Sequence, residues 1–417
     1  MFKSKRVCWN GNEIIRIILR KGSIGSLFCA YPFSMHNNYM KDYSKYIAVI
    51  GAGISGLALA CTLKKANVPV VVFEKSSNVS EHGAGISLSR NGRTVLKHLG
   101  LDQKVAEKSG KPEKASFFSN GKEVTSILVD VITTSRQTIY KALLDDYTSL
   151  DGEIIFNYEL SNIDLEESSI SFTNNSSHKV LHIVACDGIK SYCRKKCFPS
   201  SGEPNYSGYS VWRGIIDKKQ KNIETHLGPN FHIVTYPINN TRTSFVAAIK
   251  TNTQYKESWK VKGSYRDLKS DLPVDMESVF SFLKEDDDFY KWGVFTRPKV
   301  NKLFAKNITF LGDAAHPIVP FIGQGGCLAL EDAYVFGMLV SKFKNDFNKI
   351  QIAYQKIRLK RIHQIQLLSE RQGLLNHLKN PFLILFRNLI MKYSSVISRR
   401  VKLVWNYDPM NEINNIK

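Results

Sequence analysis

A glycine-rich turn at Gly51–Gly56, with the sequence GAGISG, is the first segment of the chain with recognisable chemistry. In a turn of this spacing the first glycine permits a tight bend, and the second lets the backbone approach a pyrophosphate closely. The third, Gly56, lets a following helix pack closely on a preceding strand, and the N-terminus of that helix attracts phosphate charge. Glu74 follows 18 residues after Gly56, where a carboxylate can accept hydrogen bonds from ribose hydroxyls. The turn therefore predicts a dinucleotide site.

The residues on either side of the turn favour the elements that such a site requires. Residues 46–50 predict a short buried strand, residues 57–65 have the Ala- and Leu-rich composition of a helix, and residues 69–74 predict a second buried strand. This β-turn-α-β order begins a doubly wound parallel sheet. With all these elements in place, a chance glycine turn is the weaker interpretation. The turn alone does not distinguish FAD from NAD.

Two later motifs add polar groups to the same predicted sheet. Residues 185–191, ACDGIKS, carry Asp187, and residues 310–317, FLGDAAHP, carry Asp313 directly after a short apolar strand. Open parallel sheets bind ligands at the carboxyl ends of their strands, so Asp313 is expected at the binding edge. Residues 323–326, GQGG, offer backbone N–H groups without side-chain bulk ahead of a helix. The dipole of that helix could stabilise negative charge on a cofactor, although a plain helix-entry loop is the alternative.

These three motifs, in this order, resemble those of the FAD-dependent aromatic hydroxylases, the para-hydroxybenzoate hydroxylase-like group A flavin monooxygenases. The segment 322–333, IGQGGCLALEDA, looks most like the branch with salicylate, hydroxynicotinate and urate hydroxylases and zeaxanthin epoxidase. The resemblance runs from about residue 46 to at least residue 333. It implies an α/β fold, with a Rossmann-like FAD-binding domain, an inserted α+β substrate-domain sheet and C-terminal helices.

The resemblance also assigns cofactor-binding residues, and it implies no metal. The ADP half of FAD would be held by Gly51, Gly53, Ser55, Gly56, Glu74 and Lys75. The remainder of FAD would be contacted by Arg136, Asp187, Asp313, Gly323, Gln324, Gly325 and Gly326.

Candidate catalytic and substrate-binding residues are fewer. Arg213, in the segment VWRG, resembles a residue at the entry to the substrate lobe, and its planar guanidinium could pair with a carboxylate or phenolate. A structural or surface arginine is an equal alternative there. Tyr236 ends a predicted strand and Arg242 follows the next turn, so both are candidates for substrate contact, although an exposed hairpin arginine explains Arg242 as well. His316 is a candidate catalytic proton-transfer residue, against a structural histidine near the flavin.

The activity implied by the resemblance is an NAD(P)H-consuming monooxygenase. NADH or NADPH would reduce FAD, the reduced flavin would add O₂ as a C4a-hydroperoxide, and one oxygen atom would pass to an aromatic or unsaturated small molecule. Two alternatives stay open: an enzyme of the same superfamily acting on a lipid or isoprenoid-quinone substrate at a membrane surface, or a non-catalytic FAD-binding protein. An NAD-dependent dehydrogenase would leave the two later motifs unexplained, and the Trp-x-Trp-x-Ile-Pro signature of flavin halogenases is missing.

A length of 417 residues suits two lobes. The expected order is a basic N-terminal extension at 1–45, the first part of the FAD-binding domain at 46–205, the substrate domain at 206–298, the second part of the FAD-binding domain at 299–345, and a C-terminal helical region at 346–417. The extension is either a targeting segment or an upstream addition outside the fold. Within the substrate domain, strands are expected at residues 231–238 and 243–250.

The net charge of +21 attracts anions in general, but no nucleic-acid-binding motif accompanies it, so no nucleic acid is expected. Seven scattered cysteines suit the reducing cytoplasm, and Cys193 and Cys197 have no second ligand pair close by for zinc. Residues 346–391 are expected to be helical and basic, with apolar residues on one face. Such a stretch packs on its own domain or, as the alternative, touches an anionic membrane. The oligomeric state is not readable from the sequence.

Overall fold

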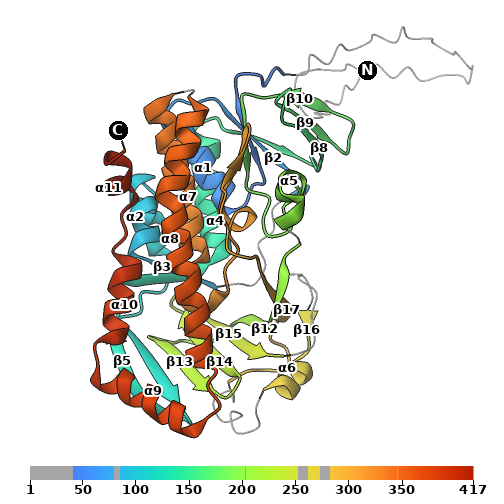
Figure 1. The fold of residues 1–417 in the computed structure, drawn as a ribbon. Helices are drawn as coiled ribbons and strands as arrows, with labels where there is room; N and C mark the ends of the chain where they lie inside the picture. Colours follow the sequence, from blue (N-terminus) through green and yellow to red (C-terminus); the bar gives the residue numbers. More distant parts are fainter. Residues whose placement is uncertain are drawn as a thin grey trace, which may run out of the picture. The chain divides into compact units, whose positions relative to one another are not determined.

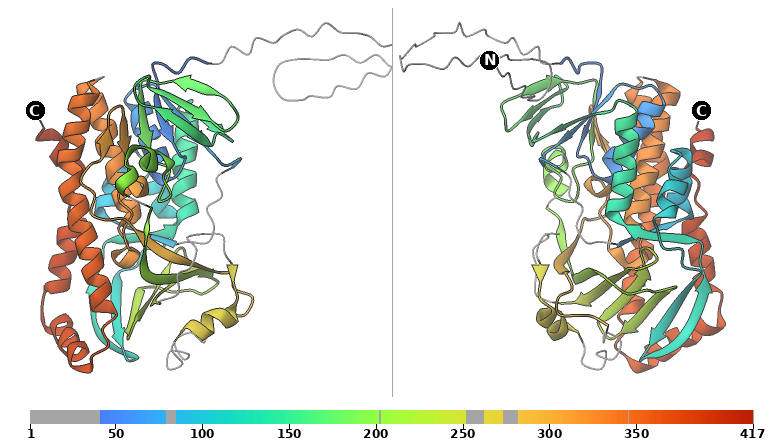
Figure 2. Two further views of the ribbon diagram at one scale, coloured as in Figure 1. Left: turned by 45° about the vertical axis from the view of Figure 1, so that its right-hand side comes forward. Right: turned by 180° about the vertical axis from the view of Figure 1, so that it is seen from behind.

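The computed structural model describes residues 41–78, 85–201, 203–251, 262–272, 282–344 and 346–416. The extension predicted at 1–45 therefore lies almost entirely outside the described residues. From Asp42 onward the chain forms one unit. Figure 1 labels its elements, and Figure 2 shows them from two further sides.

A mainly parallel sheet carries the glycine-rich turn. Among the described residues its strand order is β18-β19-β11-β1-β2-β7, and only the β18–β19 pair is antiparallel. The strands are β1 (Ile47–Ile50), β2 (Val70–Glu74), β7 (Glu153–Phe156), β11 (His182–Ala185), β18 (Phe304–Ala305) and β19 (Ile308–Phe310). The residues of β1 and β11 are fully buried, as expected for parallel strands covered on both faces. This confirms the strands predicted at 46–50 and 69–74, and β19 confirms the short apolar strand predicted ahead of Asp313.

Helices pack beside this sheet (Figures 1 and 2). Helix α1 (Ile54–Lys65) follows the glycine turn directly and packs against α7 (Gly325–Phe343) and α4 (Arg136–Ser149). Helix α7 in turn packs against α8 (Phe347–Asn376). The shorter helices of this region are α2 (Arg90–His98), α3 (Asp102–Glu107), α5 (Tyr192–Cys197) and α11 (Pro409–Asn414). Two small sheets accompany them: β3 (Gly85–Ser89) with β6 (Val131–Ser135), and β8 (Leu160–Asp164) with β9 (Ser169–Phe172) and β10 (Ser177–Lys179).

A second large sheet has the described strand order β16-β17-β12-β15-β14-β13-β4-β5. Its strands are β4 (Lys114–Ser119), β5 (Lys122–Leu128), β12 (Asn205–Ile216), β13 (Ile223–Gly228), β14 (Phe231–Pro237), β15 (Thr243–Lys250), β16 (Lys262–Gly263) and β17 (Phe289–Thr296). The strands predicted at 231–238 and 243–250 are confirmed as β14 and β15, which pair antiparallel.

The two strands β4 and β5 come from the part of the chain assigned to the FAD-binding domain, not from 206–298. Strand β4 joins the sheet through parallel pairing with β13, in the register Phe117 to Thr225. A sheet-based division of the chain therefore places 114–128 with the substrate sheet. Pairing between strands so distant in sequence leaves no local signal in the residues themselves.

The two faces of this sheet have different partners. One face carries Trp212, Ile233, Phe245 and Phe289, which pack with Leu268 of helix α6 (Tyr265–Asp271) into a separate core. The opposite face carries Ala248, Trp292 and Val294, which pack with Phe321 of the segment that precedes α7. These residues line the cavity described below.

The predicted basic helical stretch at 346–391 consists of two helices. Helix α8 ends at Asn376, and α9 (Pro381–Tyr393) begins after Asn380, whose side chain accepts hydrogen bonds from the backbone N–H groups of Phe382 and Leu383. Pro381 stands at the first position of α9, where its missing N–H has no cost. Helix α10 (Val396–Trp405) follows. The apolar face predicted for α8 is confirmed, because Tyr354, Ile357, Ile362 and Ile365 are all buried.

Candidate functional site

The glycine turn has the steric properties that a phosphate-binding loop needs. Gly51 has a φ of +102°, and a Cβ there would lie 2.6 Å from the carbonyl oxygen of Cys186. A Cβ on Gly56 would lie 2.0 Å from the carbonyl oxygen of Gly51, so only glycine lets α1 pack this closely on β1. A Cβ on Gly53 would meet nothing within 4 Å. The middle glycine thus faces open space, which is where a ligand could approach the backbone.

Glu74, at the end of β2, is turned toward this loop. Its Oε2 accepts a hydrogen bond from the backbone N–H of Ala52 at 2.8 Å, and its Oε1 accepts one from Ser76 at 2.9 Å. Each oxygen keeps a further lone pair, so the carboxylate can still accept from a hydroxyl. Lys75 is exposed.

A single cavity of about 830 Å³ connects the glycine turn with the second sheet. Nine of the predicted site residues line it, which are Gly53, Ser55, Arg136, Arg213, Tyr236, Asp313, Gly323, Gly325 and Gly326. Its volume lies in the upper part of the range of ligand pockets, roughly 300–1,000 Å³. The structure therefore brings most of the predicted residues to one space.

The segment 323–326 forms the N-terminus of α7. Gly323 has a φ of +63°, and Gly325 and Gly326 begin the helix with their backbone N–H groups beside the cavity. A Cβ on Gly326 would lie 2.4 Å from Cδ1 of Ile86, so this glycine also permits a close approach to β3. The helix end can stabilise negative charge on a bound ring. The Gln324 side chain is buried away from the cavity wall, where its amide donates to Ser89 Oγ at 2.9 Å.

Asp313 follows β19 in a short 3₁₀ turn and is exposed at the cavity wall. A hydrogen bond from α7 holds this turn in place, because the backbone N–H of Gly312 donates to Oδ2 of Asp332 at 2.9 Å. Gly312 itself has a φ of +56°. The position of Asp313 therefore depends on a carboxylate of α7.

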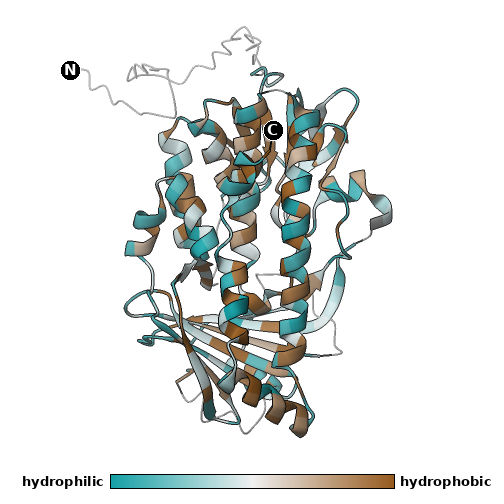
Figure 3. Cartoon of the chain, turned by 60° about the vertical axis from the view of Figure 1, so that its left-hand side comes forward, coloured by the Kyte–Doolittle hydropathy of each residue, from teal (hydrophilic) through white to brown (hydrophobic). Residues whose placement is uncertain are grey.

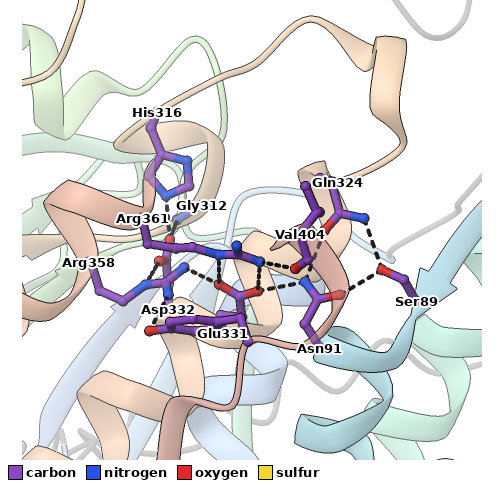
Figure 4. Close-up of polar contacts among 11 residues, drawn as sticks. Ser89, Asn91, Gly312, His316, Gln324, Glu331, Asp332, Arg358, Arg361 and Val404 are labelled. Atoms are coloured by element: carbon purple, nitrogen blue, oxygen red, sulfur yellow. Dashed lines mark hydrogen bonds and ion pairs between the residues drawn. The ribbon is translucent and has the colours of Figure 1, made fainter. Parts of the chain in front are cut away.

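That carboxylate belongs to a buried ionic network between α7 and α8 (Figure 4). Arg358 contacts both acids, with Nε donating to Asp332 Oδ1 at 2.7 Å and Nη2 lying 2.8 Å from Glu331 Oε2. Arg361 donates to both oxygens of Glu331 and to the carbonyl oxygen of Val404. Both acids and Arg358 have no exposed surface. The two arginines balance the two acids, which a charge cluster in this environment requires.

The pKa values follow this arrangement. Burial alone would raise the pKa of Asp332, but its interactions with His316 and Arg358 outweigh burial and hold the pKa at about 2. For Glu331, burial is likewise outweighed by Arg358 and Arg361, so its pKa is lowered. Both carboxylates are therefore ionised at neutral pH.

His316, the candidate proton-transfer residue, belongs to the same network. Its Nε2 lies 2.5 Å from Asp332 Oδ2, the side chain is 2% exposed, and it does not line the cavity. A buried imidazole held by a structural carboxylate cannot reach a substrate in this conformation. The structure supports the competing interpretation of a structural histidine.

The substrate-side candidates separate into two groups. The guanidinium of Arg213 lies over the ring of Trp292, with Cζ 5.2 Å from the ring centre, and both residues line the cavity. Burial lowers the pKa of Arg213, Tyr236 acts in the opposite direction, and the positive charge of Arg136 lowers the pKa further. Tyr236 is buried in the same wall, and burial raises its pKa. Arg242, by contrast, is exposed in the turn after Asn239 and lies outside the cavity wall, so the expected approach of its side chain to a substrate has no structural support.

Asp187 stands behind the wall formed by Cys186, Gly188 and Ile189. Its Oδ2 accepts from the backbone N–H of Cys193 at 3.1 Å, at the start of α5, and burial raises its pKa. This geometry fits a residue that shapes the loop. Cys193 and Cys197 are free thiols, and no group of three or more potential metal ligands occurs among the described residues.

Several cavity residues were missed from the sequence. His232 and Val234 alternate with Tyr236 on β14, so the period of a strand could have placed them on the same face. His232 Nδ1 lies 2.6 Å from Nε2 of His377, the residue that follows α8, and both are buried. Residues of α9 and α10 also line the cavity, and no local pattern indicated this.

Comparison with known proteins decides the family. Residues 45–365 match the family model described as the FAD binding domain, which is more than three quarters of the chain. The chain belongs to this family. It is 25% identical over 358 residues to 3-hydroxybenzoate 6-hydroxylase of Polaromonas naphthalenivorans, with 79% of this chain and 88% of the relative covered. It is 25% identical over 414 residues to a salicylate hydroxylase of Pseudomonas putida, with 90% and 94% covered.

Solved structures show the same fold. A structure of Klebsiella pneumoniae HpxO with FAD and uric acid superposes with a TM-score of 0.75 at 21% identity, covering 87% of this chain and 96% of the other. A substrate complex of salicylate hydroxylase gives a TM-score of 0.74 at 20% identity, with 88% and 97% covered. The resemblance to FAD-dependent aromatic hydroxylases is thereby confirmed. The protein is an FAD-dependent monooxygenase of this family, in which NAD(P)H is the typical reductant.

The residues of the cavity fit FAD. The open space at Gly53, the N-terminus of α1 behind it and the acid at the end of β2 match the requirements of an adenosine diphosphate group. The glycines before and at the N-terminus of α7 line the cavity without side-chain bulk, so they leave room for a planar ring. These two ends belong to one continuous cavity, as a single extended cofactor requires.

Proposed function

We propose that this FAD-dependent monooxygenase hydroxylates an electron-rich aromatic ring that carries an anionic group, in the part of the cavity lined by Arg213, Tyr236 and Trp292. The observation that carries the proposal is the guanidinium of Arg213, which is partly buried in the cavity wall with its Cζ 5.2 Å from the ring centre of Trp292. A partly desolvated cation is stabilised by an anionic ligand, and a planar guanidinium suits a carboxylate or phenolate. Among the described residues of the wall, Asp313 alone is acidic, whereas Arg136, Arg213, Arg387 and Arg400 are basic.

Different residues of the cavity wall bind the different parts of FAD. Gly53, Ser55 and the N-terminus of α1 hold the pyrophosphate of FAD, and Asp313 and Arg136 hold the segment between pyrophosphate and ring. The N–H groups of Gly325 and Gly326 stabilise negative charge on the ring. FAD, when bound and reduced by NAD(P)H, supplies the activation of O₂ for transfer to the substrate.

The substrate side has to orient the ring and exclude water. Arg213 anchors the anionic group, and Tyr236 can donate a hydrogen bond, since its raised pKa keeps the hydroxyl protonated at neutral pH. The wall of Val234, Val246 and Ala248 presents no polar side chain to a reactive centre. Such a dry wall protects a reactive oxygen donor from water.

The proposal is tested by NAD(P)H oxidation in the FAD-loaded protein with matched aromatic pairs, such as salicylate against phenol and 3-hydroxybenzoate against 3-hydroxybenzyl alcohol. We expect the carboxylates to accelerate flavin reduction and to give a product that contains one atom from ¹⁸O₂. Equal stimulation by charged and uncharged members would contradict the role of Arg213. FAD binding without any oxygenated product would favour a non-catalytic flavoprotein.

A membrane surface is the partner that we propose for the C-terminal helices. Helix α9 is exposed at apolar side chains on several sides, with Phe382 at 81%, Phe386 at 63% and Leu385 at 58% exposure. Figure 3 shows this helix as largely hydrophobic. From 371 to 407 the chain has no acid, and its seven basic residues are Arg371, Lys379, Arg387, Lys392, Arg399, Arg400 and Lys402. Apolar surface rimmed by cations suits an anionic lipid surface.

Among the described residues, none of the helices is both long and apolar enough to cross a bilayer. Contact would therefore be peripheral, with α9 lying in the interface. Flotation with vesicles tests it: we expect binding to phosphatidylcholine vesicles with 30% phosphatidylglycerol, weaker binding to phosphatidylcholine alone, and loss of binding in a Phe382→Ser/Phe386→Ser variant. No binding to either vesicle, with a concentration-dependent dimer instead, would assign the face to a second copy of the chain.

A further inference from the structure

Beyond Arg213 and the glycines of α7, the cavity extends into a region between β4–β5 and the C-terminal helices. On the sheet side its wall consists of Ala115, Phe117, Ile127 and Val129. On the helix side its wall consists of Leu368, Leu375, Ile390, Met391, Val396, Ile397 and Val401. Figure 1 shows how α9 and α10 flank β5 at this end of the second sheet. We call this region the apolar channel.

The polar groups of the channel are satisfied within the protein. Arg387 donates to Ser119 Oγ, to the carbonyl oxygen of Leu375 and to Asn388 Oδ1, at 2.9 to 3.1 Å. These bonds attach α9 to β4. Arg400 donates to Gln372 Oε1 at 3.2 Å. The remaining channel wall is aliphatic or aromatic, so a ligand gains free energy there chiefly by burying hydrocarbon.

The channel reaches the molecular surface beside α9. Leu375, Ile390 and Val396 belong to the cavity wall, yet 37%, 37% and 42% of their surfaces are exposed. Residues that line the cavity and are also exposed to solvent lie at the mouth of the cavity. The mouth is therefore surrounded by the same exposed apolar side chains that cover α9. A hydrocarbon chain that leaves the channel would enter apolar surroundings.

We propose that the apolar channel is a binding subsite for the hydrocarbon chain of the substrate, so that the natural substrate is an aromatic ring with a long alkyl or isoprenoid tail. The inference rests on the proposed function, because it places the ring beside Arg213 and the flavin glycines. It adds that the tail runs along β4–β5 under α9 and α10. A small hydroxybenzoate would leave this space empty, and apolar cavities that no ligand fills cost stability.

A homologous series of 6-n-alkylsalicylates, from methyl to pentadecyl, tests the channel, because each member keeps the carboxylate that Arg213 is proposed to bind and only the chain length changes. The dissociation constant is measured through quenching of intrinsic fluorescence, since Trp292 and Trp405 both line the cavity. Flavin reduction by NAD(P)H is measured in parallel. We expect each added CH₂ to tighten binding about fourfold until the chain passes the mouth, from the usual transfer free energy of a methylene.

Adjacent residues on β5 provide a matched pair of variants. Ile127 lines the channel, whereas Leu128 is 86% exposed and points to the other side of the strand. We expect Ile127→Trp to weaken binding of the pentadecyl compound at least tenfold and to leave the methyl compound unchanged. Leu128→Trp should change neither. If Ile127→Trp folds poorly, α10 provides a second pair of variants. Val401 lines the channel and Leu403 is exposed, so Val401→Trp is compared with Leu403→Trp as its control.

The outcomes separate the two proposals. Affinity independent of chain length in the unmodified protein, or equal effects of Ile127→Trp and Leu128→Trp, would overturn the channel. Chain-length-dependent affinity that Ile127→Trp removes, without flavin reduction or oxygenated product for any member, would uphold the channel and contradict the proposed hydroxylation instead.

Discussion

Replacing Asp332 by asparagine should both destabilise the protein and weaken FAD binding. One oxygen of Asp332 accepts from Arg358, and the other accepts from the backbone of Gly312 and contacts His316. Asparagine keeps a single acceptor, and its amide nitrogen would face one of these donors. The turn that carries Asp313 would then lose its support from α7.

The magnitude follows from the charges. The pKa of Asp332 is about 2, nearly two units below the usual value near 4. Such a shift corresponds to about 2 kcal/mol of stability at neutral pH. An unsatisfied buried donor adds about 1–3 kcal/mol. The sum agrees with the cost of breaking a buried ion pair, about 3–5 kcal/mol.

The pH dependence has a defined sign. Because folding lowers the pKa of Asp332, its stabilisation is complete above the pKa of the unfolded chain and is lost as pH falls toward 2. The difference in unfolding free energy between the protein and Asp332→Asn should therefore shrink between pH 5 and pH 3. Urea unfolding followed by tryptophan fluorescence measures it, and the flavin-to-protein ratio after gel filtration reports FAD retention.

Asp145→Asn is the matched control, because Asp145 and Lys104 form a pair at 3.3 Å with nearly half of each side chain exposed. Exposed pairs contribute about 0–1 kcal/mol. A loss of stability in Asp332→Asn no larger than that of Asp145→Asn, with FAD retained, would refute the structural role of the network.

Three further predictions concern the cavity. Gly56→Ala should unfold at a lower urea concentration even without FAD, because its Cβ would lie 2.0 Å from a carbonyl oxygen. Gly53→Val should keep the stability of the FAD-free protein and lose affinity for FAD, because its side chain would fill the open space beside the loop. Urea unfolding measures the first effect, and flavin titration measures the second. Arg213→Met should raise KM for hydroxybenzoates about 10- to 100-fold, as loss of a charge-assisted hydrogen bond predicts, and Arg242→Met should leave it unchanged; equal effects in steady-state assays would contradict the assignment. Burial, with a smaller effect of Lys250, lowers the pKa of His377 to about 4 in the folded protein. The contribution of neutral His377 to stability should therefore be full above pH 6.5 and fall as the pH drops toward 4. In His377→Gln, the free energy of unfolding in urea should change less between pH 7 and pH 5 than in the unmodified protein.

The sequence was sufficient for the FAD unit because the required features are local. All of these features lie within 30 residues: Gly51 with its φ of +102°, the helix that follows the turn, and the carboxylate at the end of the next strand. The N-terminus of α7 is equally local, since Gly323 to Gly326 form one segment. Local requirements of this kind restrict residue types position by position.

The remaining features depend on pairings between distant segments. The addition of β4 to β13 and the closure of the cavity by α9 and α10 join residues more than 100 positions apart. His316 could be taken for a proton-transfer residue because its partner Asp332 is indistinguishable in sequence from a surface acid. Its burial becomes visible only when α8 brings Arg358 beside it.

The most direct test of the central claim is oxygen incorporation by the FAD-loaded protein under ¹⁸O₂ with NAD(P)H and the hydroxybenzoates and alkylsalicylates named above. The structure predicts that FAD binds at one per chain and that at least one of these rings gains a single ¹⁸O atom, with one NAD(P)H consumed per product. Failure to bind FAD, or NAD(P)H consumption that yields only hydrogen peroxide with every ring offered, would contradict it.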